Sequence, residues 1–392
     1  MKPTDYFSWQ RVLNRKKQWG VGKMKDNRSG RDRKKKRKMV LIAVVAIMIC
    51  GALLFIALSV YGKHQMSKIA GLSFQEALEY TTKNNAEAVI TVGIIKNGNA
   101  SYTVYGENGK ELPKELHTYE IGSLTKTFTA AMVSKGVQEG KMDIDATIDQ
   151  YLSLPAGNAY PTVAELLTHT SGYKSHYIES PMISNFFTGK NSFLGVSKAM
   201  VVDRAGKLSV PNEDYPFNYS NYGYAVLGLI LEKVYGDDYA ALVGRFVKEL
   251  NLSHTQLSAQ DGDLGRYWDW NEGDAYLSAG GLTSDINDML IYAQTQLDEV
   301  GYFADCHKEL KKINAASEQY KAMGINMDAI GMAWIIDSEN GVVWHNGGTG
   351  NYNSYLGFNA AKNVAVIVLS NLAPSCRIPA TVLGVKLLNE LE

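Results

Sequence analysis

Residues 39–61 form an uninterrupted apolar run of 23 residues that contains no Lys, Arg, Asp or Glu. As a helix rising about 1.5 Å per residue, this run would be roughly 35 Å long, enough to cross a hydrocarbon core of about 30 Å with some tilt. A secretory signal peptide has an apolar core of only about 7 to 15 residues. The run therefore favours one uncleaved transmembrane helix, with a cleaved signal peptide and a buried core helix as alternatives.

The charged residues of the chain are segregated on the two sides of this run. The whole sequence has 40 Lys and Arg and 40 Asp and Glu, yet residues 1–38 hold 15 basic and 3 acidic side chains, a net charge of +12. Basic segments beside a membrane span stay on the cytoplasmic side. We therefore expect a cytoplasmic arm over 1–38, a linker over 62–72 and an extracytoplasmic domain over 73–392.

The basic arm has two possible kinds of partner. Its position beside the apolar run favours the anionic headgroups of membrane lipids, which attract basic segments close to the surface. A base-stacking platform for nucleic acid needs closely spaced aromatic residues, and those of the arm are few and scattered. We expect lipid contact and no nucleic-acid partner.

The domain after the linker carries the patterns of an α/β (α+β) fold whose strands come from its two ends. A capping box at Ser73 and Glu76 begins a helix that runs to about residue 84, and a last helix is predicted over 378–391. Six strands are predicted, the first two joined by an Asn-Gly turn, over 88–95, 100–105, 332–337, 342–345, 354–359 and 364–370. These patterns predict one antiparallel sheet flanked by helices, with a mostly helical region over 107–325.

The first candidate for chemistry is Ser-Leu-Thr-Lys at residues 123–126. On a helix these two polar side chains lie on one face, one turn apart, so the Lys126 amine can hydrogen-bond to the Ser123 hydroxyl and activate it. Apolar residues at helical spacing, ended by Gly140, predict a helix with Ser123 in its first turn, where backbone N–H groups favour negative charge. The structural alternative is a capping serine beside a solvated lysine.

A second Ser-x-x-Lys pattern occurs at Ser171 and Lys174. It follows a turn that contains glycine and begins no apolar helical pattern. We therefore prefer Ser123 as the nucleophile. The neighbouring His169 lies in a threonine-rich turn and is interpreted as structural rather than as a catalytic base.

Two further groups of residues gain weight from their order along the chain. Tyr219 and Asn221 stand directly before a predicted helix over 224–235, and His345 and Gly347 end a predicted strand. Taken singly, they are a packed aromatic, a strand-end histidine and a turn glycine. Together with the first motif they give the order Ser-x-x-Lys, Tyr-x-Asn, His-x-Gly.

In this order the motifs resemble the serine β-lactamase and penicillin-binding protein superfamily, in its class C β-lactamase, D,D-carboxypeptidase and esterase-like branch. Segments 165–172 and 277–284 look like the same branch. The resemblance covers residues 73–392 and implies an antiparallel sheet flanked by helices with an all-α region. The sequence contains no Gly-x-Ser-x-Gly, phosphate-loop or His-Glu-x-x-His motif, which argues against an α/β-hydrolase, an NTPase and a zinc peptidase.

The resemblance implies an acyl-enzyme mechanism that needs no metal and no organic cofactor. Ser123 would be the acylated nucleophile, and Lys126 would be its activating partner. Tyr219 would accept and donate the proton, although the residues leave open whether Tyr219 or Lys126 takes it first. Asn221 would orient substrate or the lysine, and the N–H groups of Ser123 and Gly348 would form the oxyanion hole.

The strand motif departs from the pattern of the branch. β-Lactamases of this branch usually read Lys-Thr-Gly where this chain has His345, Asn346 and Gly347, which we assign to substrate binding. The missing hydroxyl at Asn346 leaves recognition of a β-lactam or peptide carboxylate open, and esterases and D-aminopeptidases share the fold. We expect cell-wall peptide or β-lactam substrates first, and small esters or D-amino-acid peptides second. A penicillin-binding sensor without turnover is the third alternative.

Two smaller expectations concern titratable side chains. An ordinary phenol has a pKa near 10, so ionising Tyr219 near neutral pH requires positive charge nearby, which Lys126 and a charged His345 would supply. Cys306 and Cys376 leave one disulfide possible but give no disulfide framework.

Overall fold

The computed structural model describes residues 67–211, 213–258 and 262–391. The predicted cytoplasmic arm and membrane span, over 1–61, lie outside these residues and stay predictions. Within the described ranges no helix is both long enough and apolar enough to cross a bilayer. Residues 64–392 group as one compact unit.

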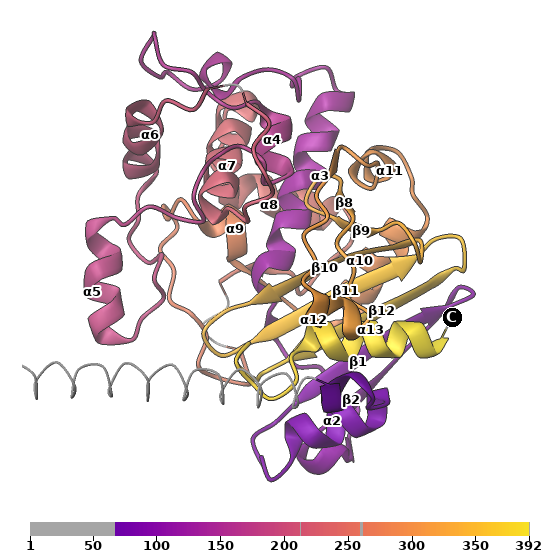
Figure 1. Cartoon of the computed structure of the whole chain (residues 1–392). Coiled ribbons are helices and arrows are strands. Elements are labelled where there is room, and N and C mark those ends of the chain that lie inside the picture. The colour runs from indigo at the N-terminus through magenta and orange to yellow at the C-terminus, as the bar shows by residue number, and fades with distance from the viewer. Residues whose placement is uncertain (1–66, 212, 259–261, 392) are drawn as a thin grey trace, which may run out of the picture. The chain divides into compact units, whose positions relative to one another are not determined.

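A nine-stranded antiparallel sheet is the centre of this unit (Figure 1). Its strand order is β3-β2-β1-β12-β11-β10-β9-β8-β7. The strands run over β1 Ile90–Lys96, β2 Asn99–Tyr105, β3 Glu111–Leu112, β7 Lys311–Lys312, β8 Ala329–Ile330, β9 Ile335–Asp337, β10 Val342–Gly348, β11 Asn353–Asn359 and β12 Val364–Ser370. Because β1 pairs with β12, the sheet joins the two ends of the domain, as predicted.

Local sequence signals at the start of the domain are confirmed. Helix α2 (Phe74–Thr82) begins at Ser73, whose side chain accepts from the backbone N–H of Glu76 while the Glu76 carboxylate accepts from the backbone N–H of Ser73. The turn between β1 and β2 holds Asn97 at φ 51° and Gly98 at φ 77°. Positive φ at both positions is what a type I′ hairpin turn requires.

The central strands are buried on both faces and divide the core into two clusters. In β12, the side chains of Val364, Val366 and Val368 pack in one cluster with α2 and α13 (Ala380–Leu391). The residues between those valines pack in the second cluster, with the helical region. This period of two is the alternation expected of a strand with both faces covered. Helix α10 (Ile286–Leu297) approaches the second face closely where the sheet has Gly93.

The segment between the sheet-forming ends is mostly helical, as predicted. Its helices are α3 Thr125–Gln138, α4 Val163–Leu167, α5 Ser180–Thr188, α6 Lys198–Lys207, α7 Asn221–Tyr235, α8 Tyr239–Glu249, α9 Leu277–Gly280, α10 Ile286–Leu297, α11 Tyr302–Cys306 and α12 Glu318–Ala322. Figure 1 shows α4, α6, α7 and α8 grouped on the far side of α3 from the sheet. Helix α3 therefore stands between the helical region and the sheet.

The structure corrects the sequence prediction in several places. A second, three-stranded sheet of β4 (Tyr119–Glu120), β6 (Leu282–Ser284) and β5 (Gln256–Leu257) was not predicted, because strands of two or three residues are too short to show an alternating pattern. The strand predicted over 332–337 begins only at β9, because Ala333 has a φ of 72°. Strand β10 continues to Gly348, beyond the predicted end at 345.

The capping box gives a direct test of α2. We expect Ser73→Ala to lower the free energy of unfolding by about 1 kcal/mol, because the backbone N–H of Glu76 loses its acceptor. Urea denaturation of the unit over 64–392 measures this change. Gln75→Ala, within the same helix, is the control and should have a smaller effect. Equal stability of Ser73→Ala and the parent would contradict the importance of this cap.

Candidate active site

Ser123 lies on a short 3-10 turn, η2 (Gly122–Leu124), directly before α3. The prediction that Ser123 occupies the first turn of the α-helix is therefore wrong, because the α-helix begins only at Thr125. The cause is Gly122, whose φ of 51° stops the regular helix from extending backwards. Lys126 lies in the first turn of α3, and its Nζ is 3.0 Å from Ser123 Oγ. The predicted pairing of the two side chains is thus present.

Lys126 is fully buried, and its Nζ has three oxygen partners. Besides the Ser123 hydroxyl, these are Asn221 Oδ1 at 2.7 Å and the carbonyl of Ala279 at 2.6 Å. Burial lowers the pKa of the Lys126 amine well below its ordinary value, because the interior disfavours the charged form. A neutral amine is the form that can accept a proton from a hydroxyl.

Tyr219 completes a group of four predicted residues. Its phenol lies close enough to the Ser123 side chain for Ser123 to lower the phenol pKa slightly, and Lys126 Nζ lies 4.9 Å from the centre of its ring. Asn221 is the first residue of α7. Burial raises the pKa of the Tyr219 phenol above its ordinary value. The phenol therefore keeps its proton near neutral pH.

His169 holds the segment that carries Tyr219. Its carbonyl accepts from the backbone N–H of Asn218 at 2.8 Å, and its Nδ1 accepts from the backbone N–H of Ser220 at 3.1 Å. Its ring is packed against the Tyr219 ring, with the ring centres 4.4 Å apart. His169 is buried and has a φ of 56°. These contacts agree with the structural interpretation of His169 and show that it positions Tyr219.

The end of β10 forms the opposite wall of the site. Strand β9 pairs with β10 only as far as Trp344, so the last residues of β10 face the turn that carries Ser123. A Cβ on Gly347 would lie 1.9 Å from the Ile121 carbonyl oxygen, and a Cβ on Gly122 would lie 2.5 Å from the Gly348 nitrogen. Because only glycine permits this backbone contact, Gly347 and Gly348 are brought beside Ser123, as the motif order predicted.

His345 is neutral, which corrects the prediction of a charged ring beside Tyr219. Burial, followed by the proximity of Lys126, lowers the pKa of His345 to about 3. Its Nδ1 donates to the Asn346 carbonyl at 2.6 Å, so its Nε2 is left as an acceptor. The His345 and Tyr219 ring centres are 6.3 Å apart. The ring lies in the site but supplies no positive charge there at neutral pH.

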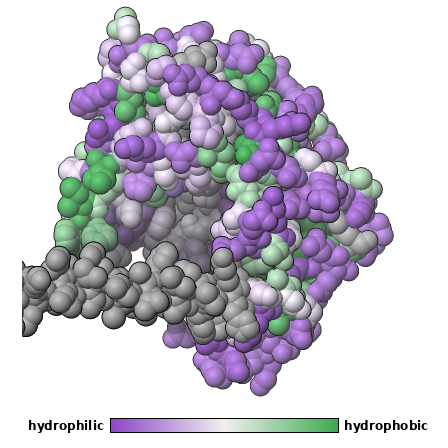
Figure 2. All heavy atoms as spheres, viewed as in Figure 1, coloured by the Kyte–Doolittle hydropathy of each residue, from purple (hydrophilic) through white to green (hydrophobic). Residues whose placement is uncertain are grey.

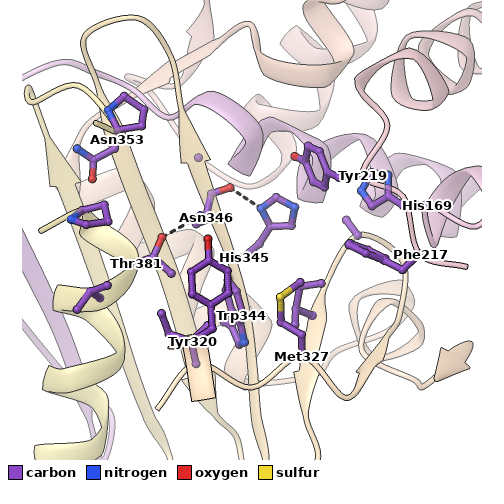
Figure 3. Close-up of a pocket in the computed structure, with 17 residues that line it drawn as sticks. His169, Phe217, Tyr219, Tyr320, Met327, Trp344, His345, Asn346, Asn353 and Thr381 are labelled. Atoms are coloured by element: carbon purple, nitrogen blue, oxygen red, sulfur yellow. Dashed lines mark hydrogen bonds between the residues drawn. The ribbon is translucent and has the colours of Figure 1, made fainter. Parts of the chain in front are cut away.

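A cavity of about 360 Å³ opens beside these residues (Figure 3). Tyr219, His345 and Gly347 line one part of it, and much of the remainder is apolar or aromatic, including Phe217 and Trp344. None of its lining residues is a Lys, Arg, Asp or Glu. A substrate group in this cavity would meet an apolar surface with a few neutral polar groups.

Asn346 points toward the C-terminal helix. Figure 3 shows the hydrogen bond that its side-chain amide donates to Thr381 Oγ1, at 2.8 Å. Thr381 lies in α13 and also lines the cavity. A hydroxyl that is missing at position 346 is therefore present next to it, on another element.

Three residues that support the site carried no usable signal in the sequence. The Glu120 carboxylate is buried and accepts from the backbone N–H of Trp268 and from Thr349 Oγ1, each at 2.5 Å. Ser354 Oγ donates to the Ile121 carbonyl at 2.7 Å. Ala279, the third, holds Lys126 through a backbone carbonyl, which any residue would offer. Only the similarity of segment 277–284 to the β-lactamase branch drew attention to that region.

The other sequence candidates make no hydrogen bond with Ser123 or Lys126 among the described residues. Ser171 and Lys174 lie in an irregular segment, in agreement with the prediction that this second motif begins no helix. Cys306 and Cys376 are free thiols, so the disulfide that the sequence left open is not formed.

One group among the described residues has the composition of a metal site: His254, Asp285 and Asp288, whose ligand atoms lie within 4.8 Å of one another. Asp285 caps α10, and Asp288 accepts from the backbone N–H of His254 and from Thr255 Oγ1. Both carboxylates therefore have structural partners. None of these residues contacts Lys126 Nζ.

Comparison with known proteins identifies this arrangement. A family model described as Beta-lactamase matches residues 74–382. The chain belongs to the Beta-lactamase family. This confirms the superfamily predicted from the motif order.

Several solved structures share the fold at low sequence identity. A Yersinia pestis protein described as a β-lactamase/D-alanine carboxypeptidase complexed with citrate matches with a TM-score of 0.63 and 19% identity, over 83% of this chain and 97% of that chain. The octameric penicillin-binding protein homologue from Pyrococcus abyssi matches with a TM-score of 0.62 and 23% identity, over 86% of this chain and 76% of that chain.

A curated relative is Protein flp of Staphylococcus aureus strain MRSA252. It is 24% identical over an alignment of 309 residues, which covers 71% of this chain and 58% of flp. The chain thus spans little more than half the length of this relative.

The contact between β10 and the Ser123 turn can be tested by adding one methyl group. We expect Gly347→Ala to slow acylation of Ser123 by at least tenfold, because the new Cβ would overlap the Ile121 carbonyl and displace the turn. The rate of labelling by a fluorophosphonate measures this. Gly244→Ala in α8, where a Cβ meets no atom within 4 Å, is the matched control. Equal labelling rates for the two variants would contradict the proposed contact.

The buried neutral state of His345 predicts a pH dependence of stability. An unfolded histidine titrates near 6.5, whereas the folded pKa is about 3. Between these values the unfolded chain binds more protons, so the free energy of unfolding should fall as the pH is lowered from about 6.5 toward 3. His345→Gln should make this fall shallower in urea denaturation across that range. An unchanged pH dependence in the variant would show that His345 is not held neutral.

Proposed function

We propose that this chain is a membrane-anchored, extracytoplasmic serine hydrolase that acts through an acyl-enzyme on amide or ester bonds. Ser123 is the nucleophile, and Lys126 is the group that removes its proton. The observation that carries the proposal is the 3.0 Å contact between Lys126 Nζ and Ser123 Oγ, made by an amine that is fully buried. Membership of the Beta-lactamase family supports the same reaction class.

The partners of Lys126 explain why its lone pair points at the serine. A neutral amine has two N–H donors and one lone pair. The Ala279 carbonyl oxygen and the side-chain oxygen of Asn221 can only accept hydrogen bonds. The two N–H groups of the Lys126 amine therefore donate to these two oxygens. The lone pair is then left for the Ser123 hydroxyl. Burial favours this neutral form, and the geometry supports Lys126 over Tyr219 as the first proton acceptor.

We propose that Tyr219 transfers a proton to the leaving group. Burial keeps its phenol protonated, and its proximity to Ser123 and Lys126 would place the hydroxyl next to the bond being broken. When Ser123 Oγ attacks the carbonyl carbon, its proton passes to Lys126. A proton is then delivered through Tyr219 to the departing amine or alcohol. Water later attacks the acyl-enzyme and releases the acid.

The oxyanion hole is proposed to consist of the backbone N–H groups of Ser123 and Gly348. Support comes from the backbone contact between Gly122 and Gly348, which brings these two segments together. Developing negative charge on the carbonyl oxygen would be stabilised there without movement of side chains.

We propose two substrate classes. Cell-wall peptides and β-lactams are the first, because a structural neighbour of this fold is described as a β-lactamase/D-alanine carboxypeptidase. Esters with an uncharged, apolar group are the second. The cavity beside Tyr219 favours them, because its lining includes no cationic side chain for a substrate carboxylate and His345 is neutral.

Membrane anchoring is supported by sequence alone. The 23 uncharged residues over 39–61 and the +12 charge of residues 1–38 favour a single span with the arm in the cytoplasm. The hydrolase domain would then act outside the cell membrane.

Covalent labelling tests the nucleophile. We expect a fluorescent penicillin or a fluorophosphonate to label the parent chain, and Ser123→Ala to abolish labelling and to lower turnover by several orders of magnitude. Ser171→Ala, in the second Ser-x-x-Lys pattern, is the control that should label normally. Normal turnover by Ser123→Ala would refute the assignment.

A turnover assay of the parent chain distinguishes the proposed substrate classes. A chromogenic β-lactam, a D-Ala-D-Ala peptide and a p-nitrophenyl ester would be compared for turnover. Faster turnover of the ester would indicate that the apolar cavity determines which substrate the protein accepts. Stoichiometric acylation with no subsequent release would instead indicate a penicillin-binding sensor.

A further inference from the structure

Helix α5 and the residues before it carry an exposed apolar patch. It consists of Ile178, Ile183, Phe186 and Phe187, whose exposed fractions are 70%, 54%, 78% and 80%. Figure 2 shows apolar side chains gathered over α5 on this face of the molecule. Scattered single apolar residues are normal on a surface, whereas contiguous exposed patches mark interaction sites.

The patch is held outward by the rest of α5. Met182 and Asn185 are the buried residues of this helix, and the Asn185 side chain donates to the Leu194 carbonyl at 2.8 Å. The rings of Phe186 and Phe187 contact each other edge to face, with centres 5.5 Å apart. Since the buried side of the helix is fixed, its apolar side needs a partner outside the domain.

The charged residues within the segment that carries the patch are mainly positive. Between residues 174 and 190 the basic side chains are Lys174 and Lys190, both exposed. The acid of this segment, Glu179, is paired with Arg204 at 2.9 Å. An apolar surface flanked by lysines is typical of elements that lie in the interface of an anionic bilayer.

The chain between the apolar run and the domain limits how far the start of the domain can lie from a membrane. The apolar run ends at residue 61, and α2 begins at Phe74. Even fully extended, the dozen residues between them reach at most about 40 Å. A domain tethered so closely stays beside the bilayer, so lipid is an apolar partner always close to an exposed patch on it.

The patch is small for a dimer interface. At roughly 150 Å² for each fully exposed large side chain, the four residues offer about 400 Å². A stable protein–protein interface takes about 800 Å² from each partner. Shallow insertion into lipid headgroups has no such requirement for area or shape.

We propose that the patch docks the hydrolase domain on the surface of the bilayer that anchors it. Phe186, Phe187 and Ile183 would enter the headgroup region, and Lys174 and Lys190 would contact anionic headgroups. The inference rests on the membrane anchoring proposed above. A cavity of about 490 Å³ is lined by patch residues and by Asn221, which holds Lys126. Docking would therefore place an entrance to the active site at the membrane interface, within reach of substrates held there.

The test uses the full chain reconstituted in vesicles of phosphatidylcholine and phosphatidylglycerol. In a Cys50→Ser, Cys376→Ser background, which keeps the buried Cys306, Phe187→Cys is labelled with an environment-sensitive fluorophore. Doxyl-labelled lipid should quench this probe several-fold more than a probe at Val300→Cys, an apolar position that is 65% exposed between α10 and α11. Lys190→Glu should reduce the quenching in anionic vesicles.

Each other outcome overturns the inference in a distinguishable way. Equal quenching at the two probe positions, with the chain floating with the vesicles, would leave the anchor in place and exclude docking. Loss of the chain from the vesicles would remove both anchor and docking, while Ser123 labelling would still report the hydrolase. A change in the probe that follows protein concentration, without lipid quenching, would assign the patch to a second copy of the chain.

Discussion

The burial of the Lys126 amine is the constraint on which the rest of the site depends. An amine removed from water must either lose its proton or satisfy all its donors, and the three oxygens around Nζ make both states possible. These oxygens come from the turn before α3, from the first residue of α7 and from α9. Three separate segments must therefore be held to within a fraction of an ångström, and the supporting contacts of the fold serve this purpose.

Those supporting contacts are mostly to the backbone rather than between reactive groups. His169 fixes the segment of Tyr219 through a carbonyl and a ring nitrogen, and Glu120 joins the loop after β10 to the segment at Trp268. Gly347 permits β10 to touch the chain at Ile121 directly. The reactive side chains can stay few and neutral because positioning is carried out by residues that take no part in the chemistry.

Whether a feature of the fold or site could be predicted depends on whether it is set by residues that are close in sequence or by distant partners. The Ser73 capping box, the Asn-Gly turn and the long buried strands depend on neighbours in sequence, and they were predicted correctly. The motif order brought Ser123, Lys126 and Tyr219 together through a family resemblance. The small sheet and the role of Glu120 depend on distant partners and left no local pattern. The charge of His345 was predicted wrongly, because burial cannot be read from a strand-end histidine. The membrane span lies outside the described residues and stays a prediction.

The antiparallel sheet has a consequence for when the protein acquires activity. Strand β1 pairs with β12, and Ser354 bonds to Ile121, 233 residues earlier in the chain. During synthesis from the N-terminus, Ser123 is made long before the strands that complete its surroundings. A nascent or truncated chain thus carries the serine without the β10 wall, so its hydroxyl stays as unreactive as that of any other serine. The arrangement of the sheet delays completion of the site until β10 and β11 have been synthesised.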